Sequence, residues 1–434
     1  QERRIPEPMM RNPNPTRGER WLTLLIYELA VIFFFIPAGR FHISLFGWYS
    51  FSTGYDAYKL FPVLLFTWLA WRIQNLDKPW PQSRFVFPFF LLFLVSLIAA
   101  VTSQDFFEAV SEALEILSYF FFLILLLDIP WTPRRIQTVA VGFVIGNLYL
   151  ASQAWMHYQT LNPALPARVS ATFRHPNFLG FYGLLGLTLS FWILNQSRRP
   201  RHTFWVGVSI AGLLFAVVTS QSRVALVALG LWLLVLLVLG HGRLRRFAVA
   251  GLFAGMMALV FSPDIVARFS AMAYETPAAE QVNRVRIWLH YLEHEIPTLP
   301  YFGIGLGPVA DTRMNDRLAA DPSTASVLSH KWGPHNAYLA WLLGTGLAGM
   351  FALFWLLKEI LRTAWASDSE NRPLWMAGWL AMLLVITVQD PLLYANIPLA
   401  LIAMLVLTGK TAGKTAGNTA SAFRTEPPPQ EDAS

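Results

Sequence analysis

A histidine stands at the predicted start of a hydrophobic helix in KWGPHNAYLAWLLGTGLAG, residues 331–349. Pro334 suits the first position of a helix, so we expect His335 at the helix mouth, where unpaired backbone amides point outward. The positive end of a helix attracts anions and favours a neutral imidazole. A neutral imidazole can accept a proton, so His335 could act as a general base. The alternative is an interfacial histidine that only caps the helix.

Two further predicted helix starts carry arginines. They lie in ATFRHPNFLG at 171–180 and in TSQSRVALV at 219–227. Three helix N-termini on one side would direct their free amides to a common interface, with Arg174, Arg223 and His335 beside them. Amides and arginines together suit a phosphate group. The convergence of the three starts is an expectation, because spacing alone does not establish it.

Several carboxylates stand near the same predicted side. Asp390, in VQDPLLY, could orient His335 or pair with an arginine, and the alternative is an ordinary helix-end aspartate beside a proline turn. Glu108, Glu112 and Glu115 share one helix face. They could relay protons or ions. We favour pairing with arginines or contact with a substrate hydroxyl, because an unpaired charge inside the membrane is costly.

The composition indicates an integral membrane protein. Of the 434 residues, 55% are hydrophobic and 14% are charged, with a mean hydropathy of +0.44, whereas soluble proteins carry about 25% charged residues. The chain has no cysteine, which excludes disulfides, thiolate metal sites and a cysteine nucleophile. HExxH, DxD and Walker motifs are absent from the sequence, so we expect no metal, no ATP and no other cofactor.

The apolar segments predict an all-α protein with about twelve transmembrane helices. They lie at about 21–38, 55–71, 85–102, 108–127, 136–155, 176–194, 203–221, 224–239, 247–262, 335–357, 373–390 and 395–408. An even number places both termini on one side. Two thirds of the 33 Lys and Arg residues fall in segments predicted to be cytoplasmic, which supports cytoplasmic termini.

The predicted organisation has five parts. A cytoplasmic tail at 1–20, interpreted as uncleaved, precedes nine helices at 21–262. A large outer loop at 263–334 is followed by three helices at 335–408 and a disordered cytoplasmic tail at 409–434. In the loop, QVNRVRIWLHYLEHEIP predicts an amphipathic helix on the membrane surface. The remaining Lys and Arg residues fall on the outer side, where either an anionic ligand or ordinary surface charge would account for them.

Four stretches, in this order, resemble the O-antigen ligase and O-antigen polymerase superfamily of bacterial inner-membrane glycosyltransferases. They are RVSATFRHPNFLG, then SQSRVAL, then NRVRIW followed by PYFGIGLGP, then PHNAYLAWLLGTGLAG. The resemblance covers roughly 85–405 and is most specific between 168 and 349. It implies a GT-C-like fold with the large loop in the periplasm. It also implies metal-independent transfer of a glycan from undecaprenyl diphosphate to an acceptor at the periplasmic face.

The resemblance also implies site residues. The essential histidine and arginines of the family correspond to His335, Arg223 and Arg284. Arg284 is preferred to Arg286 because the family arginine stands four residues before the tryptophan, here Trp288. The two arginines would grip the diphosphate and His335 would accept the proton of the attacking hydroxyl, inverting the anomeric centre. The residues expected to bind substrate beside them are Arg168, Arg174, His175, Asn177, Ser222, Arg286, Asn336, Tyr338 and Asp390.

The chain departs from the family pattern just before Pro176. The family usually has a small residue and an asparagine there, whereas this chain has Arg174 and His175. His175 is therefore a rival general base. We favour His335 for its position at a helix mouth and its match to the family.

The leading prediction is a ligase that joins O-antigen to lipid A-core oligosaccharide. The alternative is a polymerase that extends carrier-linked glycan, but one dominant outer loop favours a ligase because polymerases more often have two. A transporter of lipid-linked glycan is less favoured, because no half-repeat is visible. The expected partners are the undecaprenyl-diphosphate-linked donor, lipid A-core and membrane lipids, without nucleic acid. We expect a monomer or weak dimer.

Overall fold

The computed structural model describes most of the membrane domain. The described residues are 16–38, 42–45, 49–52, 61–103, 105–161, 168–173, 175–196, 200–261, 288–289, 291–306, 336–388 and 398–410. Five residues expected at the site lie outside these ranges, namely Arg174, Arg284, Arg286, His335 and Asp390.

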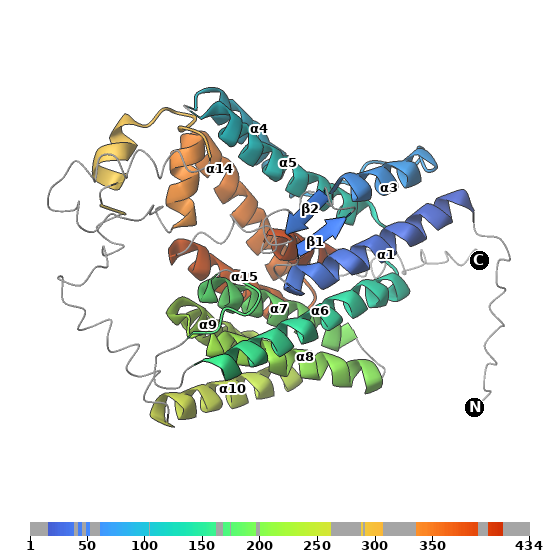
Figure 1. Cartoon of the computed structure of the whole chain (residues 1–434), viewed down its shortest axis with the longest axis vertical. Helices are drawn as coiled ribbons and strands as arrows, with labels where there is room; N and C mark the ends of the chain where they lie inside the picture. Colours follow the sequence, from blue (N-terminus) through green and yellow to red (C-terminus); the bar gives the residue numbers. More distant parts are fainter. Residues whose placement is uncertain are drawn as a thin grey trace, which may run out of the picture.

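Helices make up nearly all of the described chain (Figure 1). They are α1 (Arg17–Ala38), α3 (Phe61–Ile73), α4 (Val86–Val101), α5 (Phe106–Asp128), α6 (Pro133–Thr160), α7 (Pro176–Gln196), α8 (Pro200–Thr219), α9 (Arg223–Leu239), α10 (Gly242–Phe261), α14 (Ala337–Ala366), α15 (Arg372–Val388) and a last helix, Pro398–Lys410. Each apolar segment predicted from the sequence overlaps one of these helices.

Two short elements depart from the expected all-α chain. Strands β1 (His42–Leu45) and β2 (Tyr49–Ser52) form an antiparallel hairpin, with Ile43 opposite Phe51.

The predicted amphipathic helix of the outer loop is irregular where it is described. A π-helical turn, Tyr291–Glu295, leads into a 3-10 turn, Ile296–Thr298. Tyr291 is buried there and Leu292 is half exposed.

The helices have the length and surface of a multi-pass membrane protein. Among the described residues, α5, α6, α7, α8 and α14 are long and apolar enough to cross a membrane. Shorter apolar helices, including α4 and α9, accompany them. Large apolar side chains such as Phe66, Phe253 and Phe351 are more than half exposed, which suits contact with lipid better than contact with water.

Helix starts follow local capping chemistry. Proline is the first residue of α6, α7 and α8, where its missing N–H has no helical partner to lose. The N-caps of α5, α6, α9 and α14 each accept a hydrogen bond from the first turn of their helix; they are Asp105, Thr132, Ser222 and Asn336. Polar residues between apolar runs therefore set where these helices begin.

The central helix is α7, in which every residue from Phe178 to Trp192 is buried. It packs against α8, α9 and α15, and α1 packs along α6 (Figure 1). Two pairs of buried polar side chains join α7 to neighbouring helices. The Tyr182 hydroxyl donates to Asn147 Oδ1 at 2.9 Å, and Trp232 Nε1 donates to Thr188 Oγ1 at 3.0 Å. The core thus holds the α7 start rigidly at one end of the bundle.

Candidate functional site

Arg168 joins two of the three helix starts that the sequence singled out. It lies in the loop before α7, and its Nε donates to the carbonyl oxygen of Ser220 at 3.1 Å. Its Nη2 donates to Asn177 Oδ1, in the first turn of α7, at 2.5 Å. The amide of Val169 adds a bond to the carbonyl of Thr219 at 3.2 Å. The loop, the α7 start and the α8–α9 turn are therefore one unit, which we call the Arg168 latch.

The α7 and α9 starts approach each other closely at Gly180. A Cβ added there would lie 2.6 Å from Ala225 Cβ and 3.0 Å from Ser220 Oγ. Such distances leave no room for any side chain larger than hydrogen. The predicted convergence of these two helix starts is therefore present in the structure.

Two residues beside the latch hold strained backbone conformations. Ala171, in the loop before α7, has φ 49°, and Gln221, in the α8–α9 turn, has φ 47°. They are the only non-glycine residues with positive φ in the described part of the chain. A left-handed conformation costs a non-glycine residue about 1 kcal/mol or more, and such strain concentrates at functional sites.

Ser222 and Arg223 have different environments although they are neighbours. Ser222 is 1% exposed, and its Oγ accepts the amide of Ala225 at 3.3 Å. It caps α9, and burial keeps its side chain away from a substrate in this conformation. Arg223 is half-buried in the first turn of α9, next to the latch. A guanidinium beside free helix amides suits an anionic group.

His175, the rival base, is engaged with the backbone. Its Nδ1 accepts the amide of Asn177 at 3.2 Å, and its ring meets Phe178 edge-on. A neutral imidazole that accepts at Nδ1 carries its proton on Nε2. Neither nitrogen can then take a substrate proton unless the bond to Asn177 breaks. This geometry favours a capping role for His175.

His157 is a site residue that sequence reasoning did not identify. It lies in the last turn of α6, and its Nδ1 accepts the amides of Ser170 and Ala171 at 3.4 and 3.2 Å. It therefore supports the strained turn at Ala171. The sequence shows only that His157 lies at a helix end, a short distance before the RVSATF stretch. Spacing does not show which loop a histidine at a helix end contacts.

The third helix start differs from the prediction. We expect Pro334 as the first helical residue, whereas α14 begins at Ala337 with Asn336 as its N-cap. The reason is that Asn336 Oδ1 accepts the amide of Leu339 at 3.1 Å, which fixes the cap two residues beyond the proline. His335 falls outside the described residues. It directly precedes the cap in sequence.

The α14 start connects to the other two through α15. Tyr338, in the first turn of α14, has a side-chain hydrogen bond with Thr387, near the end of α15, and stacks on Phe354. In turn, α15 packs against α7 and α9 (Figure 1). A direct contact between the α14 start and the Arg168 latch is not among the described contacts, so the meeting of all three starts stays a prediction.

A short segment in the middle of the outer loop is hydrogen-bonded to α14. Amides of Ile304 and Gly305 donate to the carbonyls of Leu343 and Gly344 at 2.9 and 3.0 Å. The helix breaks there, because Gly346 has φ 64° and ψ −164°. We call residues 301–306 the glycine strap. A Cβ on Gly346 would collide with the carbonyl of Tyr301.

The three glutamates of α5 lie on one half-buried face, as their spacing predicts. Glu115 accepts a hydrogen bond from the hydroxyl of Tyr119, one turn later on the same helix. All three take part in interactions, and their pairing with arginines stays a prediction. The start of α5 also meets the glycine strap, since a Cβ on Gly305 would lie 3.1 Å from Ala109 Cβ.

Comparison with protein families finds a match over a part of the chain that includes the α9 and α14 starts. The model of the family described as O-antigen ligase matches residues 208–354. The chain contains an O-antigen ligase family domain. A search of curated proteins found no match to the chain. The O-antigen ligase domain runs from within α8 through α9, α10 and the outer loop into α14, so it contains Ser222, Arg223 and Asn336.

The O-antigen ligase domain also spans positions outside the described residues, among them Arg284, Arg286 and His335. The loop with Arg168, His175 and Asn177 precedes the matched region, yet the latch fixes it to the α8–α9 turn inside that region. This segment precedes the matched region in sequence but contacts it in the structure.

Proposed function

We propose that the protein is a glycosyltransferase of the bacterial inner membrane that works at the periplasmic face. It would transfer O-antigen polysaccharide from undecaprenyl diphosphate to lipid A-core oligosaccharide. The observation that carries the proposal is the O-antigen ligase match over residues 208–354, which contains Arg223, Arg284 and His335 together.

In the proposed reaction, a hydroxyl oxygen of the acceptor attacks the anomeric carbon of the donor. His335 takes the proton of that hydroxyl. The bond between the anomeric carbon and the diphosphate breaks, and undecaprenyl diphosphate leaves. Arg223 and Arg284 stabilise the charge that develops on the diphosphate, so no metal ion is required. Attack from the opposite face inverts the anomeric centre.

The rigid end of the bundle supports this role. The Arg168 latch, the cap by Ser222 and the close approach at Gly180 fix the first turn of α9. Arg223 is part of that turn. A preorganised cation needs little rearrangement as charge develops on the leaving group, and this is the main source of electrostatic catalysis.

The test is transfer by purified protein in nanodiscs with undecaprenyl-diphosphate glycan, lipid A-core and EDTA. We expect glycan on lipid A-core with the wild type and with His175→Ala, and none with His335→Ala. Loss of transfer with His175→Ala alone would make His175 the base. Longer carrier-linked glycan with lipid A-core unchanged would make the protein a polymerase. No transfer to either acceptor, with lipid-linked glycan carried across the membrane, would indicate a transporter.

A further inference from the structure

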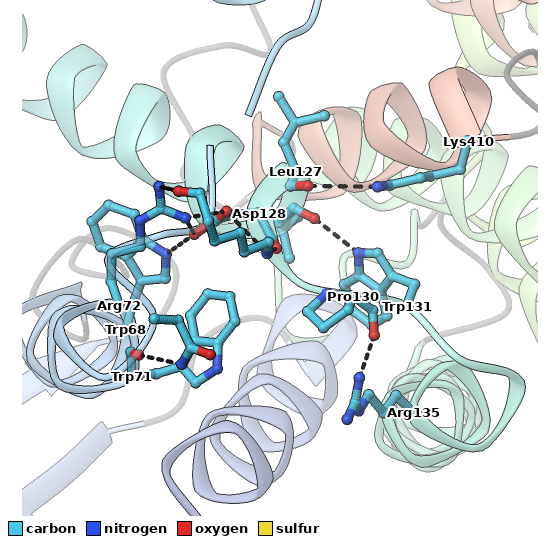
Figure 2. Close-up of polar contacts among 12 residues, drawn as sticks. Trp68, Trp71, Arg72, Leu127, Asp128, Pro130, Trp131, Arg135 and Lys410 are labelled. Carbon is cyan, nitrogen blue, oxygen red and sulfur yellow. Dashed lines mark hydrogen bonds and ion pairs between the residues drawn. The ribbon is translucent and has the colours of Figure 1, made fainter. Parts of the chain in front are cut away.

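A buried carboxylate gathers cations at the end of α5 (Figure 2). The helix α6 begins beside it and ends near the Arg168 latch, so the two sites lie at opposite ends of the bundle. Asp128, the last residue of α5, is 3% exposed. Its carboxylate pairs with Arg72 Nη1 at 3.1 Å and with Lys78 Nζ at 3.2 Å, and accepts a hydrogen bond from Trp68 Nε1 at 3.0 Å. The last helix adds Lys410, and we call these five residues the Asp128 cluster.

The cluster carries more positive than negative charge. Lys410 Nζ donates to the carbonyl of Leu127, next to Asp128, at 3.5 Å. Three cations thus surround one buried carboxylate. The neighbouring Asp77 is exposed on its turn, while Arg135, at the start of α6, brings a further cation to this end of the bundle (Figure 2). Asp128 alone cannot balance these charges.

The environment of Lys410 reflects this imbalance. The residue lies just past the predicted end of the last membrane span. Burial lowers the pKa of its ammonium group, and the charge of Lys78 lowers it further, whereas Asp128 acts in the opposite direction. A second anion near Nζ would favour the protonated lysine.

Tryptophans line the cations and mark a membrane interface. The Lys78 ammonium lies 4.5 Å from the ring centroid of Trp71, and the Arg72 guanidinium lies 4.9 Å from that of Trp80. Trp80 is 63% exposed. Tryptophan concentrates at the headgroup level of bilayers, and its face holds cations. This combination of side chains suits the depth where lipid phosphates lie.

An apolar pocket lies close to the cluster along α5 and the last helix. It holds about 40 Å³ and is lined by side chains of α1, α5, α6, α7 and the last helix. Leu126 and Leu407, two of its lining residues, stand two and three positions before Asp128 and Lys410. Trp131 closes it near the α5–α6 connection. A short piece of hydrocarbon chain fits such a space.

We propose that the Asp128 cluster binds the phosphate of an anionic membrane phospholipid, whose acyl chain lies against the Leu126–Leu407 pocket. Lys78 and Lys410 would contact the phosphate, while Arg72 stays with Asp128. Basic pockets between helix ends bind anionic headgroups in this way. The adjoining apolar pocket and exposed Trp80 favour a lipid over a free phosphate ion. In the proposed orientation this lipid belongs to the cytoplasmic leaflet, and binding is independent of glycan transfer.

The test is native mass spectrometry and thermal unfolding of the full chain with added phosphatidylglycerol, phosphatidylcholine or inorganic phosphate. The test variant is Lys78→Gln/Lys410→Gln. The control is Lys358→Gln/Arg362→Gln, which removes two exposed cations from α14. We expect wild type and control to retain phosphatidylglycerol in preference to phosphatidylcholine, and the test variant to bind it about fivefold more weakly for each lysine removed.

Three results would overturn the proposal. In the first, the test variant retains as much phosphatidylglycerol as the wild type. In the second, the control variant loses as much phosphatidylglycerol as the test variant. In the third, inorganic phosphate stabilises the wild type as much as phosphatidylglycerol does. Because lipid retention is counted on intact folded protein, a lower melting temperature of the test variant in phosphatidylcholine does not affect the comparison.

Discussion

The two ends of the bundle fix their cations by different physics. At the Arg168 latch, a carbonyl and a side-chain amide hold the guanidinium between loops with left-handed residues. At the Asp128 cluster, a buried carboxylate holds two cations over tryptophan rings. Caps and turns contribute about 1 kcal/mol each, whereas breaking a buried ion pair costs several. Removing a cation at the first end should therefore cost activity more than stability, whereas removing the buried carboxylate at the second end should cost stability.

The largest expected effect on stability is at Asp128. Asp128→Ala leaves Arg72 buried without its carboxylate, and we expect a loss of about 3–5 kcal/mol in the free energy of unfolding. Chemical denaturation in detergent measures it. The control is Asp77→Ala on the adjacent exposed turn, expected within about 0.5 kcal/mol of wild type. Equal losses in both variants would remove the distinction between the two ends.

At the other end we expect the opposite result for Arg223. Arg223→Ala should lower the rate of glycan transfer by about 10²- to 10³-fold, because a group that stabilises the leaving charge is lost. Arg223→Lys should restore only part of it, since lysine cannot bind two oxygens with a planar fork. The melting temperature should change little. Arg243→Ala, on the exposed start of α10, is the control and should transfer normally.

A smaller effect tests the close approach of α7 and α9. Gly180→Ala places a Cβ 2.6 Å from Ala225 Cβ, so we expect a loss of about 1–3 kcal/mol from overpacking. Gly230→Ala, in α9, meets nothing within 4 Å and should stabilise the helix by up to about 1 kcal/mol. Chemical denaturation of the two variants under the same conditions measures the difference in their free energies of unfolding. Equal stability of both would mean that the helices separate without cost.

The smallest expected effect is relief of strain in the α8–α9 turn. Gln221→Gly should raise stability by about 1 kcal/mol or less, because glycine adopts positive φ without strain. Ser152→Gly, at an exposed position inside α6, should instead lower it by about 0.5–1 kcal/mol. Calorimetry of both variants would detect the opposite signs. A loss of stability with Gln221→Gly would show that the turn is not strained.

Hydrophobic runs predicted the helices of the membrane domain, because a bilayer sets their length and composition. The sequence also predicted a helix start within 219–227, and α9 begins there at Arg223, but Ser222 was expected to bind substrate and is instead the N-cap. The sequence placed the α14 start too early, since Pro334 and Asn336 are both good start signals and only the side-chain bond of Asn336 decides between them. The convergence of the α7 and α9 starts could be expected, but the residue that joins them could not.

Contacts between distant segments were the part that the sequence could not supply. Arg168 was expected to bind substrate, yet its bonds to Ser220 and Asn177 give it a structural role as well. The pairing of Asp128 with Arg72 joins residues 56 positions apart, and each reads as an ordinary helix-end charge. The contact of His157 with the loop at Ser170 and Ala171 could not be predicted from the sequence either. Spacing along one helix shows which side chains share a face, but not which neighbour they meet.

The glycine strap has a consequence for how the outer loop can move. Two backbone hydrogen bonds join it to α14 before the break at Gly346, and glycines leave no gap between the two segments. The loop cannot shift at this point without either breaking both bonds or carrying the first part of α14 with it. Slow amide hydrogen exchange at Ile304 and Gly305 would therefore indicate that the two bonds stay formed and that the loop and the start of α14 move as one unit.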